Sequence, residues 1–287
     1  MSLPLKVTLA CVLALAGAPD AAAQQQPDNE QRMQTALAKL QPQRPGLVDA
    51  YVVVAALDAD PVFNREAREA GRVLARRFDA RGRTLVLAHD EGADKADAEA
   101  SPAVLAQALD AVAAKMDRDE DVLVLYTTSH GSPDAGLNFR DPVAGSAVIA
   151  PSQLATVLDH AGARNRLLIL QACFSGQFVH ALRNATTIVV TAAAEDRSSF
   201  GCQAGNDWTF FGDALINHAF RQPLPLDVQL QRASALIAAA EDREQLTPSN
   251  PQVYTGSDTA RWLTPLEQRE PRTTSDPVGQ SVLGLGK

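Results

Sequence analysis

Cysteine is rare in this sequence, and the common cysteine motifs are missing. Only three of the 287 residues are cysteine, and they form neither a C-x-x-C pair nor a zinc-type spacing. This disfavours a thiol–disulfide oxidoreductase and a zinc-binding module. No G-x-G-x-x-G follows the first expected strand, so a dinucleotide-binding fold has little support. We therefore expect neither a metal nor an organic cofactor.

Basic runs, internal repeats and long apolar runs are missing as well. The formal net charge is −8 at pH 7, and an acidic surface disfavours nucleic acid or an anionic membrane as a partner. Beyond the first residues, no apolar run approaches the ~20 residues that cross a bilayer. The sequence thus predicts a protein without a permanent membrane span.

The first 23 residues have the pattern of a secretory signal. Lys6 supplies a positive charge, residues 7–16 form a short apolar run that contains Cys11, and residues 21–23 are all alanine, as at a cleavage site. We assign residues 1–23 to a signal peptide and expect an exported protein, periplasmic or secreted.

Strands alternate with helices along the rest of the chain. Most expected strands are continuous apolar runs, which are typical of strands buried on both faces. The expected strands are residues 51–57, 84–88, 121–128, 167–171, 186–191 and, at an edge, 252–256. Residues 132–150 favour a small hairpin. This order predicts a three-layer α/β/α sandwich with a mostly parallel central sheet of about six strands.

The mature chain divides into three parts. Residues 24–50 form an N-terminal helical segment, and residues 51–266 form the sandwich. Residues 267–287 are polar and rich in proline, threonine and serine, a composition that predicts a disordered tail.

One cysteine and one histidine follow directly on two buried strands. The strand at 167–171 leads into Cys173, and the strand at 121–128 leads into His130. Sites form at the carboxyl ends of parallel strands, and a thiol near a helix start gains thiolate character. A Cys–His pair there is the minimum for nucleophilic catalysis. The alternatives are a packing role for Cys173 and a disulfide between Cys173 and Cys202.

Four motifs resemble, in order and spacing, those of the legumain-type cysteine peptidases, the peptidase C13 family, which share a fold with the caspases. They are S-H-G at 129–131, A-C-F-S-G at 172–176, S-S-F-G-C at 198–202 and T-F-F-G-D at 209–213. The resemblance runs from about residue 51 to 220. It implies a caspase/legumain-like fold, Cys173 as nucleophile and His130 as general base. It also implies that the backbone amides of Gly131 and Cys173 bind the oxyanion.

The same resemblance implies a substrate pocket. Its residues would be Asp213, Ser198, Arg65 and Gln171, with Arg65 alternatively a solvated helix charge. Legumains have glutamate where Gln171 stands, so this pocket carries one negative charge fewer, and we expect it to bind a polar or basic side chain.

Two further residues are placed by these motifs and strands. Cys202 would be structural and free. His89 follows the strand at 84–88 and should lie near the same sheet edge, but the resemblance does not mark it.

The leading interpretation is an exported cysteine endopeptidase that cleaves peptide or protein substrates through a Cys–His dyad and an acyl-enzyme. A transamidase or ligase of the same family would use the same intermediate. A non-catalytic periplasmic binding domain of the same fold is the alternative from a different class.

Overall fold

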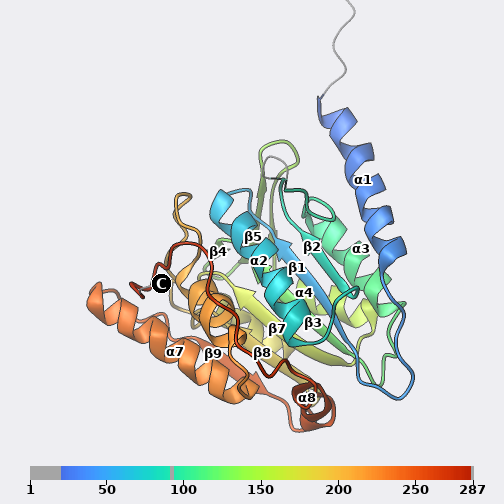
Figure 1. Ribbon diagram of the computed structural model, residues 1–287. Coiled ribbons are helices and arrows are strands. Elements are labelled where there is room, and N and C mark those ends of the chain that lie inside the picture. The colour runs from blue at the N-terminus through green and yellow to red at the C-terminus, as the bar shows by residue number, and fades with distance from the viewer. Residues whose placement is uncertain (1–20, 91–93, 286–287) are drawn as a thin grey trace, which may run out of the picture.

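A central sheet with helices on both faces makes up most of the protein (Figure 1). The structure, a computed structural model, describes residues 21–90 and 94–285. The predicted signal peptide therefore lies outside the described residues, except for its last three positions, where helix α1 begins. The helices are α1 (Ala21–Lys39), α2 (Pro61–Arg77), α3 (Pro102–Ala113), α4 (Pro151–Ala161), α5 (Val179–Leu182), α6 (Phe210–Gly212), α7 (Leu226–Arg243) and α8 (Ala260–Glu267). Shorter turns of helix are η1 (Ser175–Phe178), η2 (Asp213–His218) and η3 (Ala219–Arg221).

The main sheet has six strands in the order β2-β1-β3-β7-β8-β9. The strands are β1 (Ala50–Ala56), β2 (Thr84–Leu87), β3 (Val122–Thr128), β7 (Asn165–Gln171), β8 (Thr187–Thr191) and β9 (Gln252–Thr255). The first five are parallel, and β9 runs antiparallel to β8 at the edge. The predicted mostly parallel six-stranded sheet is confirmed, and each strand lies within two residues of its expected bounds.

Side chains of the central strands alternate between two apolar cores. In β1, Val52 and Val54 face the core under α2, α7 and α8, whereas Tyr51 and Val53 face the core under α1, α3 and α4. Strands β3 and β7 divide their side chains in the same way. This alternation follows from the two-residue period of a strand. It explains the continuous apolar runs in the sequence, because both faces of the sheet are covered.

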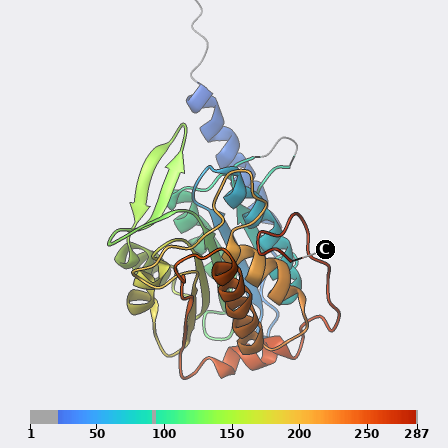
Figure 2. The ribbon, with the colours of Figure 1, turned by 90° about the vertical axis from the view of Figure 1, so that its left-hand side faces the viewer.

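A small second sheet stands at the carboxyl end of β3. It consists of β4 (Gly131–Ser132), β5 (Gly136–Asp141) and β6 (Gly145–Ile149), all antiparallel. Figure 2 shows the β5–β6 hairpin, in light green, projecting from the body of the protein. The hairpin expected within residues 132–150 is thereby confirmed.

The C-terminal tail packs against the domain, whereas its composition predicts disorder. Leu283 is 1% exposed and joins the core beneath α7. Asn217 binds both backbone groups of Val278, and the Trp208 indole donates to the Val278 carbonyl. The described part of the tail is therefore ordered, because a few side chains and backbone groups find buried partners despite the polar composition.

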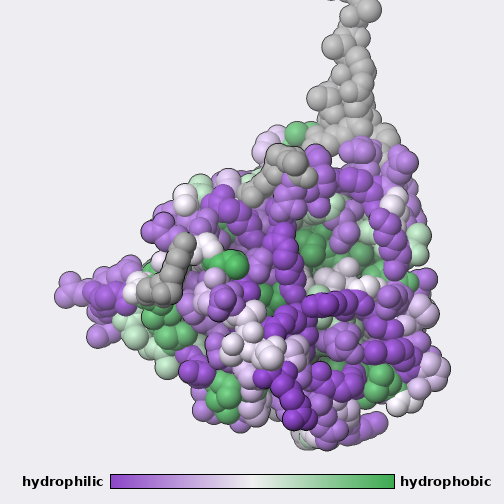
Figure 3. Space-filling model, in the orientation of Figure 1, coloured by the Kyte–Doolittle hydropathy of each residue, from purple (hydrophilic) through white to green (hydrophobic). Residues whose placement is uncertain are grey.

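The surface is mainly hydrophilic on the face seen in Figure 3, with small scattered apolar patches. None of the described helices combines the length and the apolar character that a membrane-crossing helix requires.

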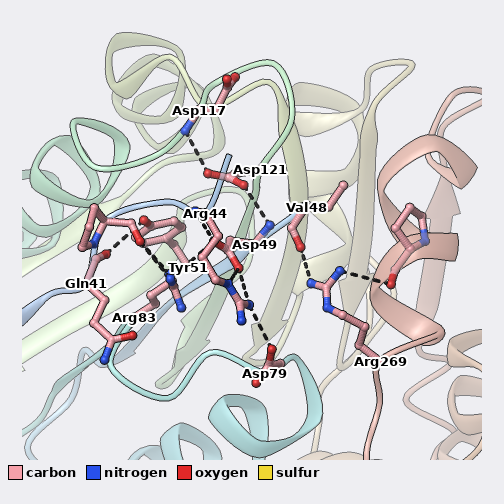
Figure 4. A network of polar contacts seen from close by, with 12 residues as sticks. Gln41, Arg44, Val48, Asp49, Tyr51, Asp79, Arg83, Asp117, Asp121 and Arg269 are labelled. Atoms are coloured by element: carbon pink, nitrogen blue, oxygen red, sulfur yellow. Dashed lines mark hydrogen bonds and ion pairs between the residues drawn. The ribbon is translucent and has the colours of Figure 1, made fainter. Parts of the chain in front are cut away.

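A buried polar network ties the amino ends of the strands together, opposite the edge that carries the site (Figure 4). Asp49 is fully buried and accepts from the backbone and side chain of Arg44, each at 2.8 Å. Its own N–H donates to Asp121 Oδ1 at 2.8 Å, and Asp117 N donates to Asp121 Oδ2 at 2.8 Å. Burial raises the pKa of the Asp121 carboxyl to about 6, although these backbone donors oppose the shift.

Replacing Asp121 with asparagine is expected to flatten the pH dependence of stability between about pH 4 and pH 6. The unfolded aspartate titrates near 3.9, so between the two pKa values only the folded state holds the proton. The free energy of unfolding of the wild type therefore falls as the pH rises through this window, by about 1–2 kcal/mol after solvent screening. Urea unfolding near pH 4 and pH 7 measures this fall in both proteins. An equal fall in the variant would contradict the assignment.

Candidate active site

Strands β3 and β7 bring the histidine and cysteine motifs to the same place. The two strands are parallel neighbours, with Thr128 opposite Gln171 at their last pair. Ser129 N continues the contact by donating to the Gln171 carbonyl at 3.1 Å. The loops that carry His130 and Cys173 therefore leave the sheet side by side at its carboxyl edge, as the sequence predicts.

Gly131 lies directly against the backbone that carries the cysteine. A Cβ at this position would overlap the carbonyl oxygen of Cys173, so only glycine permits the approach. Asn138 N donates to the His130 carbonyl, and pairs alternate along an antiparallel ladder. The next pair, Gly131 and Leu137, is therefore a non-hydrogen-bonded one, and the Gly131 N–H points away from β5. That N–H is thus available to a substrate carbonyl.

Substituting Gly131 by alanine is expected to lower the free energy of unfolding by about 1–3 kcal/mol, the usual cost of overpacking. The β3 and β7 loops must separate to admit the methyl group. Gly205 is the matched control, because a Cβ there meets nothing within 4 Å. Denaturant unfolding of both variants tests this, and equal stability of the two would show that the loops are not tightly apposed.

Cys173 sits in a strained turn between β7 and η1. The following residue, Phe174, has φ 58°, in the left-handed region that a bulky side chain rarely adopts. The Phe174 N–H donates to the Arg197 carbonyl at 2.7 Å, which holds the turn. The Cys173 Sγ contacts Ser199, at 3.4 Å from its N and 3.8 Å from its Oγ. The turn thus holds the cysteine against the loop that contains the S-S-F-G-C motif.

His130 is held by an acidic group and by an aromatic ring. Its Nε2 lies 3.2 Å from Asp60 Oδ2, and its ring packs edge-on against Phe63 with centroids 4.9 Å apart. A hydrogen bond with the Cys202 thiol and the one with Asp60 raise the pKa of His130 to about 9, and burial opposes them. The imidazole is therefore protonated at neutral pH.

The cysteine whose side chain raises the pKa of His130 is Cys202. Among the described residues no hydrogen bond joins His130 to Cys173, which the sequence predicts to face it. Catalytic contacts are often loose without substrate and tighten in the complex. Both cysteines are free, so the alternative of a disulfide between them does not hold in this structure.

Asp58 and Asp60, which sequence analysis missed, follow β1 and complete the surroundings of His130. Arg140 of β5 contacts Asp58 Oδ1 at 3.1 Å and Asp60 Oδ2 at 2.7 Å. Both carboxylates leave the same sheet edge as His130, and that placement was the signal that could have revealed them. Arg140 neutralises the acidic pair and holds Asp60 beside the imidazole.

The buried carboxylate of Glu66 connects the segments around the site. Glu66 of α2 accepts from Tyr126 Oη at 2.6 Å and Thr128 Oγ1 at 2.8 Å, both on β3. It also accepts from Thr209 N at 2.9 Å and Thr209 Oγ1 at 2.8 Å. Burial raises the pKa of Glu66, and these donors partly offset that shift. Glu66 thus joins the strand that leads to His130 to the segment that follows Cys202.

Two cavities border the site. One of about 590 Å³ is lined by the loop at 199–207, by Phe210, by the end of α7 and by the tail. Cys202 and the acidic residues Asp207 and Glu244 are among its walls. The other, of about 430 Å³, is lined by His130, Asp58 and side chains of the β5–β6 hairpin. A substrate that reaches both thiols and the histidine would contact both cavities.

Asp213 lies behind the larger cavity, although the resemblance places it in the substrate pocket. It is fully buried and accepts from Asn217 at 2.9 Å, Ser281 Oγ at 2.6 Å and Val282 N at 2.9 Å. Burial works against ionisation, but the nearby imidazole of His218 and the hydrogen bonds from Ser281 and Asn217 keep the pKa of Asp213 below its usual value. Its carboxylate holds the tail in place and does not face an open pocket.

The other predicted pocket residues are also placed differently. Gln171 is buried, and its Oε1 accepts from Thr128 Oγ1 at 3.1 Å, so it braces β3 against β7. Ser198 is exposed, and its neighbour Ser199 is the residue that contacts Cys173. Arg65 donates to the carbonyls of residues 204 and 206 and therefore supports the loop that lines the larger cavity. Sequence position alone did not show which way these side chains point.

Comparison with known proteins agrees with this geometry. The model of the peptidase C13 family matches residues 103–233, which include both His130 and Cys173. Over this segment the chain is similar to the peptidase C13 family, and the segment contains β3 and β7, the two strands that lead to these residues. This similarity supports a cysteine peptidase-like function.

The crystal structure of caspase-1 from Spodoptera frugiperda is similar at 12% sequence identity and a TM-score of 0.48, over 76% of this chain and 93% of that chain. Among the curated proteins none matches the sequence.

Proposed function

We propose that the protein is an exported cysteine endopeptidase with Cys173 as nucleophile and His130 as its acid–base partner. The observation that carries the proposal is the junction of β3 and β7, where Gly131 lies against the Cys173 backbone. This junction supports the proposal, because acyl transfer requires a thiol, an imidazole and backbone N–H donors, and the segments that carry these groups follow two neighbouring strands.

The reaction would run in two steps. The Cys173 thiolate adds to the peptide carbonyl, and the N–H groups of Gly131 and Cys173 bind the oxyanion. The protonated His130 gives its proton to the leaving amine as the C–N bond breaks, which leaves an acyl-enzyme. A water molecule then gives a proton to His130 and displaces the thiolate, releasing the acid. Asp60 and Phe63 act as positioning residues by holding the imidazole.

The larger cavity supports a preference for polar or basic side chains near the cleaved bond. Its walls include Asp207 and Glu244 beside Cys202, and none of its lining residues is basic. A cationic side chain entering it would meet two carboxylates, although Arg65 partly neutralises Asp207 at 3.5 Å. The predicted preference therefore remains, while the residues that would produce it change.

A peptide-library digest tests the proposal. Untreated protein should cleave after polar or basic residues, and protein whose thiols have been alkylated should not cleave. Mass analysis of the products also shows whether water or an added amine takes up the acyl group. Cleavage that survives alkylation would refute the cysteine mechanism, and a clear preference for Phe or Leu would refute the proposed pocket. N-terminal sequencing of the exported protein tests removal of residues 1–23, and an intact Met1 would refute it.

A further inference from the structure

Three potential metal ligands converge near the carboxyl end of β2, outside the site described above. His89 follows β2, Glu99 precedes α3, and Asp141 is the last residue of β5. One ligand atom from each lies within 4.8 Å of the others. The His89 Nε2 and Asp141 Oδ2 atoms are 3.3 Å apart. An imidazole and two carboxylates at this spacing can share one cation.

Two of these groups, His89 and Asp141, are mostly buried, with 16% and 9% of their side chains exposed, and lack full hydrogen bonding. The Asp141 side chain is only 9% exposed, and its Oδ1 accepts from Val143 N and Ala144 N in the hairpin turn. Its Oδ2 faces His89, and within the described part of the chain Asp141 has no lysine or arginine partner. The His89 Nε2 atom is buried and has no hydrogen bond among the described residues. Burying such groups is costly unless something binds them.

The surroundings of His130 provide an internal contrast. Asp58, Asp60 and His130 are also close enough to share a cation. There, however, the guanidinium of Arg140 already lies between the two carboxylates, at 3.1 Å and 2.7 Å. The positive charge which that cluster requires is supplied by the chain itself. At His89 the described residues show no equivalent for Asp141.

We propose that His89, Glu99 and Asp141 form a binding site for a divalent transition-metal ion of the zinc class. One imidazole nitrogen and two carboxylate oxygens are ligands that zinc accepts, and a fourth position remains for water. An imidazole argues against calcium, which takes oxygen ligands. The ligands come from three segments separated in sequence, so the site has no recognisable metal-binding spacing in the sequence.

The position of the site gives the ion a structural effect. Asp141 belongs to the β5–β6 hairpin, whose side chains line the cavity beside His130. Bound metal would tie the tip of this hairpin to the end of β2 and to the segment before α3. The inference is independent of the proposed peptidase activity, because neither Cys173 nor His130 takes part.

Zinc binding is best measured on a Cys173→Ala/Cys202→Ala double variant, since thiolates are themselves zinc ligands. Equilibrium dialysis against Zn²⁺ should show one ion per chain. His89→Gln and Asp141→Asn should each weaken binding about tenfold or more. Asparagine keeps one carbonyl oxygen for the hairpin turn, so Asp141→Asn preserves the fold. At 100 times the dissociation constant, Zn²⁺ should raise Tm by about 5 °C or more.

Two further variants make the experiment decisive. His160→Gln removes an exposed histidine, with 79% of its side chain accessible, and should bind zinc like the parent. Asp60→Asn disturbs the cluster beside His130 and should also bind normally. Failure of the parent to bind zinc, or undiminished binding by His89→Gln, would overturn the proposal. Loss of binding in Asp60→Asn alone would overturn it too, by moving the ion to the other cluster.

Discussion

Replacement of Cys173 by alanine is expected to abolish peptide hydrolysis, whereas replacement of Cys202 is expected to leave turnover within about an order of magnitude. Cys173 supplies the sulfur atom that forms the bond to the acyl group, so its removal stops covalent catalysis. Cys202 acts through His130 and through packing of the cavity wall. Replacing His130 should have an effect between these two, lowering the rate by a factor of about 10²–10⁴. Single-turnover hydrolysis of one good peptide by the three variants measures all of these effects.

The pH–rate profile separates the two cysteines further. The hydrogen bond with Cys202 is the largest contribution that raises the pKa of His130 to about 9. The Cys202→Ala variant should therefore lose activity at a lower pH than the wild type, because its imidazolium gives up the proton earlier. An inactive Cys202→Ala protein beside an active Cys173→Ala protein would show that the nucleophile is misassigned. Circular dichroism of each variant controls for folding.

Replacement of Glu66 by alanine is expected to be among the most destabilising single changes in the protein, at about 3–5 kcal/mol. The carboxylate is fully buried and accepts four hydrogen bonds, two from β3 and two from Thr209. Its removal leaves a cavity, and the four donors lose their hydrogen-bond acceptor. A fall in Tm of about 10 °C follows for a domain of this size.

Replacing Glu66 with glutamine is expected to lower the free energy of unfolding by less than replacing it with alanine. The carbonyl oxygen of glutamine can replace one carboxylate oxygen, but its amide group would face donors, so the loss should lie between wild type and alanine. Glu195→Ala is the surface control, because that glutamate is exposed. Urea unfolding gives the three free energies. If the Glu66→Ala and Glu195→Ala variants were equally stable, the hydrogen bonds of Glu66 would contribute little to stability. The inference that Glu66 holds the strand leading to His130 would then be wrong.

Much of the fold was predictable because strands that are buried on both faces consist of continuous apolar residues. Val52, Val54 and their neighbours are apolar at every position since helices cover both faces of the sheet. The positions of His130 and Cys173 were predictable for a related reason: each is among the first residues after such a strand. The turns, by contrast, depend on local contacts that a hydrophobic pattern does not record.

The substrate pocket shows where sequence reasoning stops. Gln171 stands next to the active-site motif in the chain, yet the two-residue period of β7 turns its side chain toward Thr128. Asp213 matches an acidic pocket position, yet the tail closes over it, and a polar tail carries no signal for that contact. Both residues were located correctly along the chain and incorrectly in their surroundings.

The amino-acid sequence by itself determined the parallel sheet, the strand ends that carry His130 and Cys173, and the resemblance to a cysteine peptidase family. These follow from local pattern, since hydrophobic period and motif order are properties of consecutive residues. Only the tertiary structure decided that Asp60 contacts His130, that Glu66 joins β3 to Thr209, and that His89, Glu99 and Asp141 converge. Such contacts join residues tens of positions apart, and their geometry depends on packing that no local segment records.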